Sequence, residues 1–132
     1  MTAKRGFSLI ETMVAIALMA IIVVAMLSAF SAITLAANRH QQETTLDRLA
    51  RSDAEYTKGQ PYQLGPPTGP VANYLNLTAG GYSFSYQVLY YSANTTPLFQ
   101  AGNPDVGLQQ IVLTVRGPNG SSEILNFLKE QP

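Results

Sequence analysis

The feature that most limits how this chain can fold is a long uncharged stretch near its N-terminus. From Thr12 to Asn38 the sequence contains no Asp, Glu, Lys or Arg. A bilayer core about 30 Å thick is crossed by roughly 20 helical residues, and the apolar run from Phe7 to Leu27 reaches that length. Lys4 and Arg5 precede the run, so the positive-inside rule puts the N-terminus in the cytoplasm and the rest of the chain outside. The sequence therefore predicts a single membrane-spanning helix.

Two ordinary interpretations of this stretch explain it incompletely. A cleaved secretory signal peptide has an apolar core of about 7–15 residues, whereas the run from Met13 to Leu27 is already at that limit and the small-residue character continues to Ala37. A plain signal anchor has the required length but gives no purpose to Glu11. A carboxylate inside a membrane segment is costly to bury, and such groups usually mark a function.

A third interpretation accounts for every residue. The sequence KRGFSLIE at residues 4–11, followed by the apolar helix, resembles the processing motif of type IV prepilins and type II secretion pseudopilins. The resemblance implies that a membrane prepilin peptidase and methyltransferase cleaves after Gly6 and N-methylates Phe7. Residues 1–6 would be the leader peptide, which stays in the cytoplasm. Glu11 would become the fifth residue of the mature protein, which in this family pairs with the N-terminus of a neighbouring subunit.

The helical geometry suggests a role for that carboxylate. Glu11 lies about one turn from Phe7 on an α-helix. A desolvated charge pair contributes little net stability but fixes register well, because a slip leaves a buried charge unpaired. We therefore expect Glu11 to set the axial stagger of subunits as they leave the membrane.

The helix is predicted to continue well beyond the membrane. No Pro or Gly occurs between Phe7 and Lys58, which permits one helix of about 50 residues. Residues 7–37 are the expected transmembrane and filament-core half, and residues 38–58 the amphipathic half. Gly59 and Pro61 end the helix. A narrow stripe at helical spacing is expected to lie on a sheet, and its members are Leu35, Gln42, Leu46, Leu49, Asp53 and Tyr56.

The helix end resembles one subgroup of the family. The segment from Ala50 to Lys58, with Pro61 and Tyr62 after it, is similar to the helix ends of minor pilins of the V type. The resemblance implies a low-abundance subunit.

Residues 59–132 carry the pattern of a small antiparallel sheet. Residues 59–73 hold four Pro and three Gly and are predicted to form a loop. Residues alternate between apolar and polar over 82–90 and 111–116, and a last strand is expected over 122–128, with a further short strand at Tyr74 to Thr78. A long helix packed on an antiparallel β-meander is an α+β arrangement, and it is the pilin fold.

The connection over residues 92–108 raises the question of a metal. It contains Asn94, Asn103 and Asp105, and major pseudopilins bind calcium in a comparable region. Calcium takes six to eight oxygen ligands, several of them from carboxylates. One carboxylate favours turn-forming residues, so we expect no metal site and no cofactor.

Composition narrows the function further. The 132 residues include no Cys, eight basic and eight acidic side chains, and loss of the leader would remove Lys4 and Arg5 to leave six against eight, a net charge of −2. Binding to duplex nucleic acid needs clustered Lys and Arg, and the sequence shows no such cluster. The only histidine, His40, is expected on the polar side of the helix, and no carboxylates are paired in a predicted cleft. We do not expect an enzyme.

These features favour a structural and assembly subunit of a type IV pilus or pseudopilus. The implied partners are the prepilin peptidase, other pilins or pseudopilins, and an inner-membrane platform with its assembly ATPase. The chain would be a single-pass protein of the inner membrane, with its C-terminal domain outside, before entering a surface pilus or a periplasmic pseudopilus. The alternative is a membrane-anchored binding domain, a receptor or adhesin that does not polymerise. The sequence does not distinguish motility, adhesion, competence and secretion machines.

Overall fold

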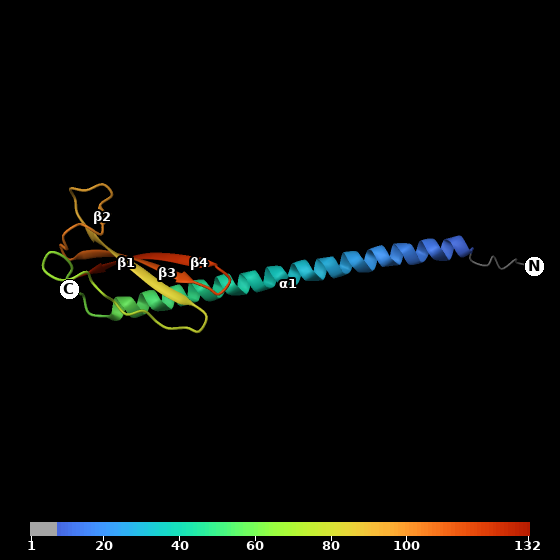
Figure 1. The fold of residues 1–132 in the computed structure, drawn as a ribbon, viewed down its shortest axis with the longest axis horizontal. Coiled ribbons are helices and arrows are strands. Elements are labelled where there is room, and N and C mark those ends of the chain that lie inside the picture. The colour runs from blue at the N-terminus through green and yellow to red at the C-terminus, as the bar shows by residue number, and fades with distance from the viewer. Residues whose placement is uncertain (1–7) are drawn as a thin grey trace, which may run out of the picture. The chain divides into compact units, whose positions relative to one another are not determined.

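The computed structural model describes residues 8–132, which contain one helix and one antiparallel sheet of four strands (Figure 1). This confirms the predicted α+β arrangement. The elements are α1 (Leu9–Gly59), β1 (Ser83–Tyr91), β2 (Phe99–Gln100), β3 (Leu108–Arg116) and β4 (Ser122–Glu130). The chain divides into two compact units, one up to His40 and one from Gln41 to Pro132.

The described part of the first unit is a single stretch of helix. Every residue from Ser8 to Gln41 is exposed in the isolated chain. Within residues 8–132, α1 is the one helix long and apolar enough to cross a membrane, and its most apolar 18-residue window has a mean hydropathy of 2.8. The uninterrupted helix follows from the absence of Gly and Pro before Gly59.

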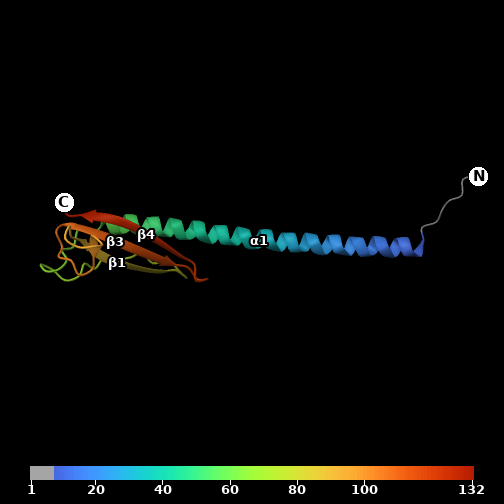
Figure 2. The same cartoon turned by 90° about the horizontal axis from the view of Figure 1, so that it is seen from above.

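The second unit contains the sheet, whose strands lie in the order β2-β1-β3-β4. All neighbouring strands are antiparallel, with Phe84 opposite Val115 and Leu113 opposite Leu125. Figure 2 shows the three long strands lying alongside the C-terminal part of α1. The connection from β3 to β4 turns at Gly120, whose positive φ of 78° suits a residue without a side chain.

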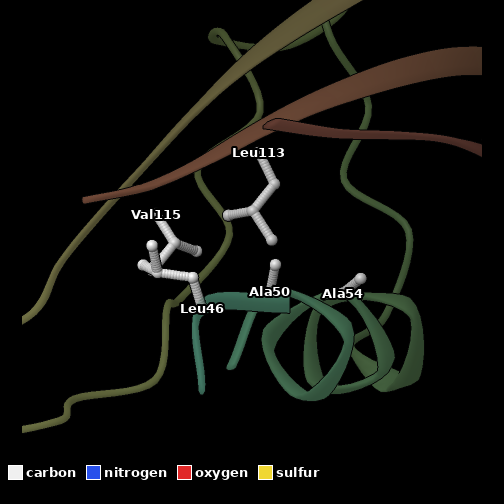
Figure 3. Close-up of a cluster of buried hydrophobic side chains, with 5 residues drawn as sticks. All are labelled: Leu46, Ala50, Ala54, Leu113 and Val115. Carbon is white, nitrogen blue, oxygen red and sulfur yellow. The ribbon is translucent and has the colours of Figure 1, made fainter. Parts of the chain in front are cut away.

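The helix packs on the sheet through small side chains. Leu46, Ala50 and Ala54 of α1 point towards Leu113 and Val115 of β3, and all five are buried (Figure 3). A second cluster lies further along the sheet and consists of Ala72, Tyr74, Val88, Tyr90 and Ile111. The predicted alternation is confirmed in all three long strands, where every second residue faces these clusters.

The predicted helix stripe is only partly correct. Leu46 and Asp53 are buried and Leu49 packs against the core, but Tyr56 is 43% exposed. The buried face instead includes Ala50, Ala54 and Thr57. Alanine side chains let the helix backbone approach β3 closely, and neither Ala50 nor Ala54 belongs to the predicted stripe.

The strand predicted at Tyr74 to Thr78 is wrong, because this segment forms its hydrogen bonds with side chains. The Gln60 amide donates to the Leu75 carbonyl at 2.7 Å and accepts from the Leu75 N–H at 2.8 Å. Gln63 makes the same two bonds with Asn73, at 2.9 and 2.8 Å. Each glutamine amide thus replaces the peptide group of a neighbouring strand. The short strand β2, paired with the end of β1, was not predicted.

Candidate functional site

The described part of the predicted assembly site begins at the first turn of α1. The Ser8 carbonyl accepts the backbone N–H groups of Glu11 at 2.9 Å and Thr12 at 3.2 Å, so Ser8 occupies the N-cap position. Glu11 is then the third residue of the helix, and Ser8-x-x-Glu11 has the spacing of a capping box. A carboxylate in the first turn also interacts favourably with the helix dipole. The helix start therefore suits an acidic residue at position 11.

Two of the predicted site residues cannot be placed. Gly6 and Phe7, predicted as the cleavage and methylation positions, lie outside the described residues 8–132. Glu11 is described and exposed.

In the helix that follows Glu11, the polar groups form hydrogen bonds within the helix, as a hydrocarbon environment requires. Its backbone groups are bonded within the helix. The Thr12 hydroxyl bonds to the Leu9 carbonyl three residues earlier, and three further hydroxyl groups bond to carbonyls four residues earlier. Ser28, Ser31 and Thr34 donate at 3.0, 3.0 and 2.9 Å to the carbonyls of Val24, Leu27 and Phe30. Because no unsatisfied hydroxyl donor is presented there, these residues add little to the cost of inserting the segment in lipid.

The connection over residues 92–108 is held by a half-buried acidic group. The Asp105 carboxylate accepts hydrogen bonds from the Tyr62 hydroxyl (2.6 Å), the Gly65 N–H (2.7 Å), the Gly107 N–H (2.9 Å) and the Gln109 amide (2.8 Å). Burial acts to raise the pKa of Asp105, but these bonds outweigh it and leave the pKa below its ordinary value. Burial and the nearby carboxylate raise the pKa of Tyr62, which keeps its hydroxyl protonated as a donor.

The same connection contains Asn103, one of the residues that raised the question of a calcium site. The Asn103 side-chain nitrogen donates to the Tyr90 carbonyl at 2.9 Å, the Thr95 hydroxyl at 3.1 Å and the Leu98 carbonyl at 3.3 Å. Among residues 8–132, no group of three or more His, Cys, Asp or Glu side chains is placed to hold a metal ion. Asn103 and Asp105 thus form hydrogen bonds with other polar groups of the chain.

A lysine of β4 caps the C-terminal end of α1. The Lys129 ammonium donates to the carbonyls of Thr57 (3.1 Å), Lys58 (2.8 Å) and Gln60 (2.6 Å). It also lies 5.2 Å from the centre of the Tyr74 ring. The last carbonyls of a helix lack hydrogen-bond partners within it and carry partial negative charge. A buried ammonium group donates hydrogen bonds to these carbonyls and also neutralises their charge. Burial lowers the pKa of Lys129.

The contacts of Asp105 and Lys129 were not predicted from the sequence. Both residues bond to partners at least 40 positions away, Gly65 for Asp105 and Lys58 for Lys129, in addition to the nearby partners of Asp105. The alternation of β4 did carry a signal, since Lys129 falls on the inward-facing side with Leu125 and Phe127. An inward lysine on an amphipathic strand indicates a buried acceptor.

Comparisons with known proteins bear on the N-terminal segment. Residues 1–27 match a family model described as the prokaryotic N-terminal methylation motif. A search of curated proteins and a search of solved structures each gave no match. The chain therefore carries, over its first 27 residues, an N-terminal methylation motif of the type IV pilin-like kind.

Proposed function

We propose that this chain is a minor subunit of a type IV pilus or type II secretion pseudopilus, inserted into the filament through α1. The observation that carries the proposal is the methylation motif over residues 1–27, which overlaps the exposed apolar part of α1, where residues 12–38 carry no charged side chain. Among residues 8–132, the exposed stretch from Ser8 to Gln41 has no apolar partner, and both lipid and the helices of other subunits provide one.

The proposed maturation follows from the residues of the motif. Hydrolysis of the Gly6–Phe7 peptide bond releases the leader and leaves a free amine on Phe7, which is then methylated. The amine remains cationic after methylation. Glu11, one turn along the helix, supplies the counter-charge for the amine of an adjoining subunit. Because both charges lose water on entering the filament, a missing partner costs about 3–5 kcal/mol.

The rest of the proposed pathway concerns partners and location. The second unit, Gln41–Pro132, lies outside the inner membrane and contacts other pilins or pseudopilins once the subunit is assembled. An inner-membrane platform and its cytoplasmic ATPase drive assembly. The minor role is supported by the resemblance of the helix end, from Ala50 to Lys58, to minor pilins of the V type.

The first test determines the N-terminus of the mature protein. Mass spectrometry of the chain from cells with an intact prepilin peptidase should give a polypeptide that begins at N-methylated Phe7. In cells that lack the peptidase it should begin at the start of the leader. A mature protein that keeps its leader in both strains, or begins after the apolar segment, would refute the proposal.

The second test separates a filament subunit from an anchored binding domain. We expect Glu11→Ala to be processed normally but to enter sheared filaments at least about a hundredfold less than wild type, as a loss of about 3 kcal/mol implies. Glu55→Ala removes an exposed carboxylate of the second unit and is the matched control. A processed wild-type chain that never appears in filaments would favour the anchored receptor or adhesin.

A further inference from the structure

The second unit contains a buried carboxylate whose bonding is incomplete. Asp53 lies on α1 and is 0% exposed. Its Oδ1 accepts the backbone N–H of Leu77, but its Oδ2 is buried and has no hydrogen-bond partner. An unpaired buried carboxylate oxygen is costly, so something must compensate for it.

A second unsatisfied oxygen belongs to Asn76, the residue before Leu77. The side-chain Oδ1 of Asn76 is also buried without a partner, and Asn76 is covalently joined to the Leu77 nitrogen that bonds to Asp53. These two oxygens are the only buried side-chain polar atoms in residues 8–132 that lack a partner. Both are acceptors, and one proton between two acceptors would satisfy both.

We propose that Asp53 is neutral in the folded protein and donates its carboxyl proton from Oδ2 to the side-chain oxygen of Asn76. The pair forms an acid-stabilised latch that holds residues 74–79 on α1. This segment has no strand partner, so the latch adds to the glutamine contacts that position it. Residues 76–80 also line an open pocket of about 600 Å³, together with Tyr82, Ser83 and Phe84.

No neighbouring charge offers another way to neutralise the carboxylate. The charged or titratable groups on the surrounding elements are Asp47, Arg51, Glu55 and Lys58 of α1, Tyr74 of the segment, Tyr82 and Tyr86 at β1, and Glu123 and Lys129 of β4. The Lys129 ammonium, which is also buried, is directed at three carbonyls at the end of α1. Arg51 pairs with Asp47 and Lys58 with Glu55, on the exposed side of the helix.

The direction of the pKa shift of Asp53 agrees with this geometry. Burial raises the pKa of Asp53, and the hydrogen bond from Leu77 lowers it only in part. A group with a raised pKa in the folded state keeps a proton that the unfolded state releases. Its contribution to stability is therefore complete below the unfolded pKa and is lost as the pH rises through the folded pKa. This consequence rests on the proposed function, in which the second unit lies outside the inner membrane and is exposed to changes of the external pH.

The test is an NMR titration of the full-length chain in detergent micelles with ¹³C-labelled Asp carboxyl groups. The sequence has three Asp residues, so three signals are expected, and Asp53→Asn identifies the relevant one. We expect the Asp53 signal to titrate above the ordinary range for Asp. We also expect the protection factor of the Leu77 amide hydrogen, which is its exchange rate corrected for the base-catalysed intrinsic rate, to fall by up to about tenfold per pH unit in that range.

The Asn76→Ala variant distinguishes this latch from its alternatives. If the Asp53 proton is donated to Asn76, removal of the acceptor lowers the pKa of Asp53. If the Asn76 amide is turned so that its NH₂ group donates to an ionised Asp53, the same variant raises the pKa and the proposal is overturned. An ordinary pKa for Asp53, or signals that respond to added NaCl or CaCl₂ in place of protons, also overturns it. Asp47→Asn, at an exposed carboxylate on the same helix, is the matched control.

Discussion

The strongest structural prediction concerns Lys129, because one ammonium group completes the end of α1. We consider Lys129→Met, which keeps the length of the side chain and removes its charge and donors. Three carbonyls, on Thr57, Lys58 and Gln60, would lose their common partner. Hydrogen bonds from a charged donor contribute about 1.5–3 kcal/mol each, but one ammonium cannot give its full value to all three and water can reach the half-buried Gln60. We expect a loss of about 3 kcal/mol.

The loss should be visible as a large change in melting temperature. For a domain of about 60–100 residues, 1 kcal/mol corresponds to about 4–8 °C, so the expected decrease is about 12–24 °C. Near-ultraviolet circular dichroism is the suitable assay, because the chain has seven Tyr and no Trp, and every Tyr lies in the second unit. Far-ultraviolet signals would be dominated by the helix in detergent.

Lys58→Met is the matched control for this experiment. Lys58 is largely exposed, pairs with Glu55 at 3.5 Å and lies 5.4 Å from the Phe127 ring centre. Contacts of this kind contribute at most about 1 kcal/mol. If the two variants melt within a few degrees of each other, the carbonyls at the end of α1 do not depend on Lys129 and the reasoning fails.

Two further substitutions test the loops of the second unit. Asp105→Asn should cost about 2–4 kcal/mol in urea unfolding, because a neutral amide cannot replace a carboxylate that accepts four bonds. Since the folded pKa of Asp105 is lowered, the wild-type advantage is present above the unfolded pKa and disappears as the pH falls through the folded value; a constant difference at all pH values would contradict this. Gly65→Ala should cost about 2 kcal/mol, because a Cβ there overlaps the Tyr90 ring, whose hydroxyl accepts the Ala72 N–H at 3.1 Å. Gly102→Ala, where a Cβ meets nothing within 4 Å, should melt like wild type, and equal melting of both variants would argue against the predicted packing.

The elements with a clear periodicity were predictable from sequence. The uninterrupted helix followed from the absence of Gly and Pro, and the strands at Ser83–Tyr91 and Leu108–Arg116 followed from their alternation. Leu125 and Phe127 were correctly placed on one face of β4 and Ile124 and Leu128 on the other. In each case the local pattern and the tertiary burial agree, which is why the local pattern was sufficient.

The contacts that fix the loops were not predictable in the same way. Gln60 and Gln63 look like ordinary polar loop residues, yet each amide binds a peptide group 10–15 residues later. The segment that they bind lies within the stretch predicted as a strand, Tyr74 to Thr78, or just before it. At the N-terminus the motif and Glu11 are visible in sequence because they are contiguous, whereas the Asp105 and Lys129 contacts depend on how distant segments meet.

The position of Lys129 on the outermost strand also affects how the sheet behaves towards other molecules. Within residues 8–132, β4 has β3 on one side and no strand on the other, so its free edge is a potential template for unwanted strand addition. A register shift of one residue would carry the buried ammonium to the opposite face of the sheet and leave the helix carbonyls bare. The same cation therefore favours one alignment of the edge strand, the one in which its ammonium group reaches the helix carbonyls.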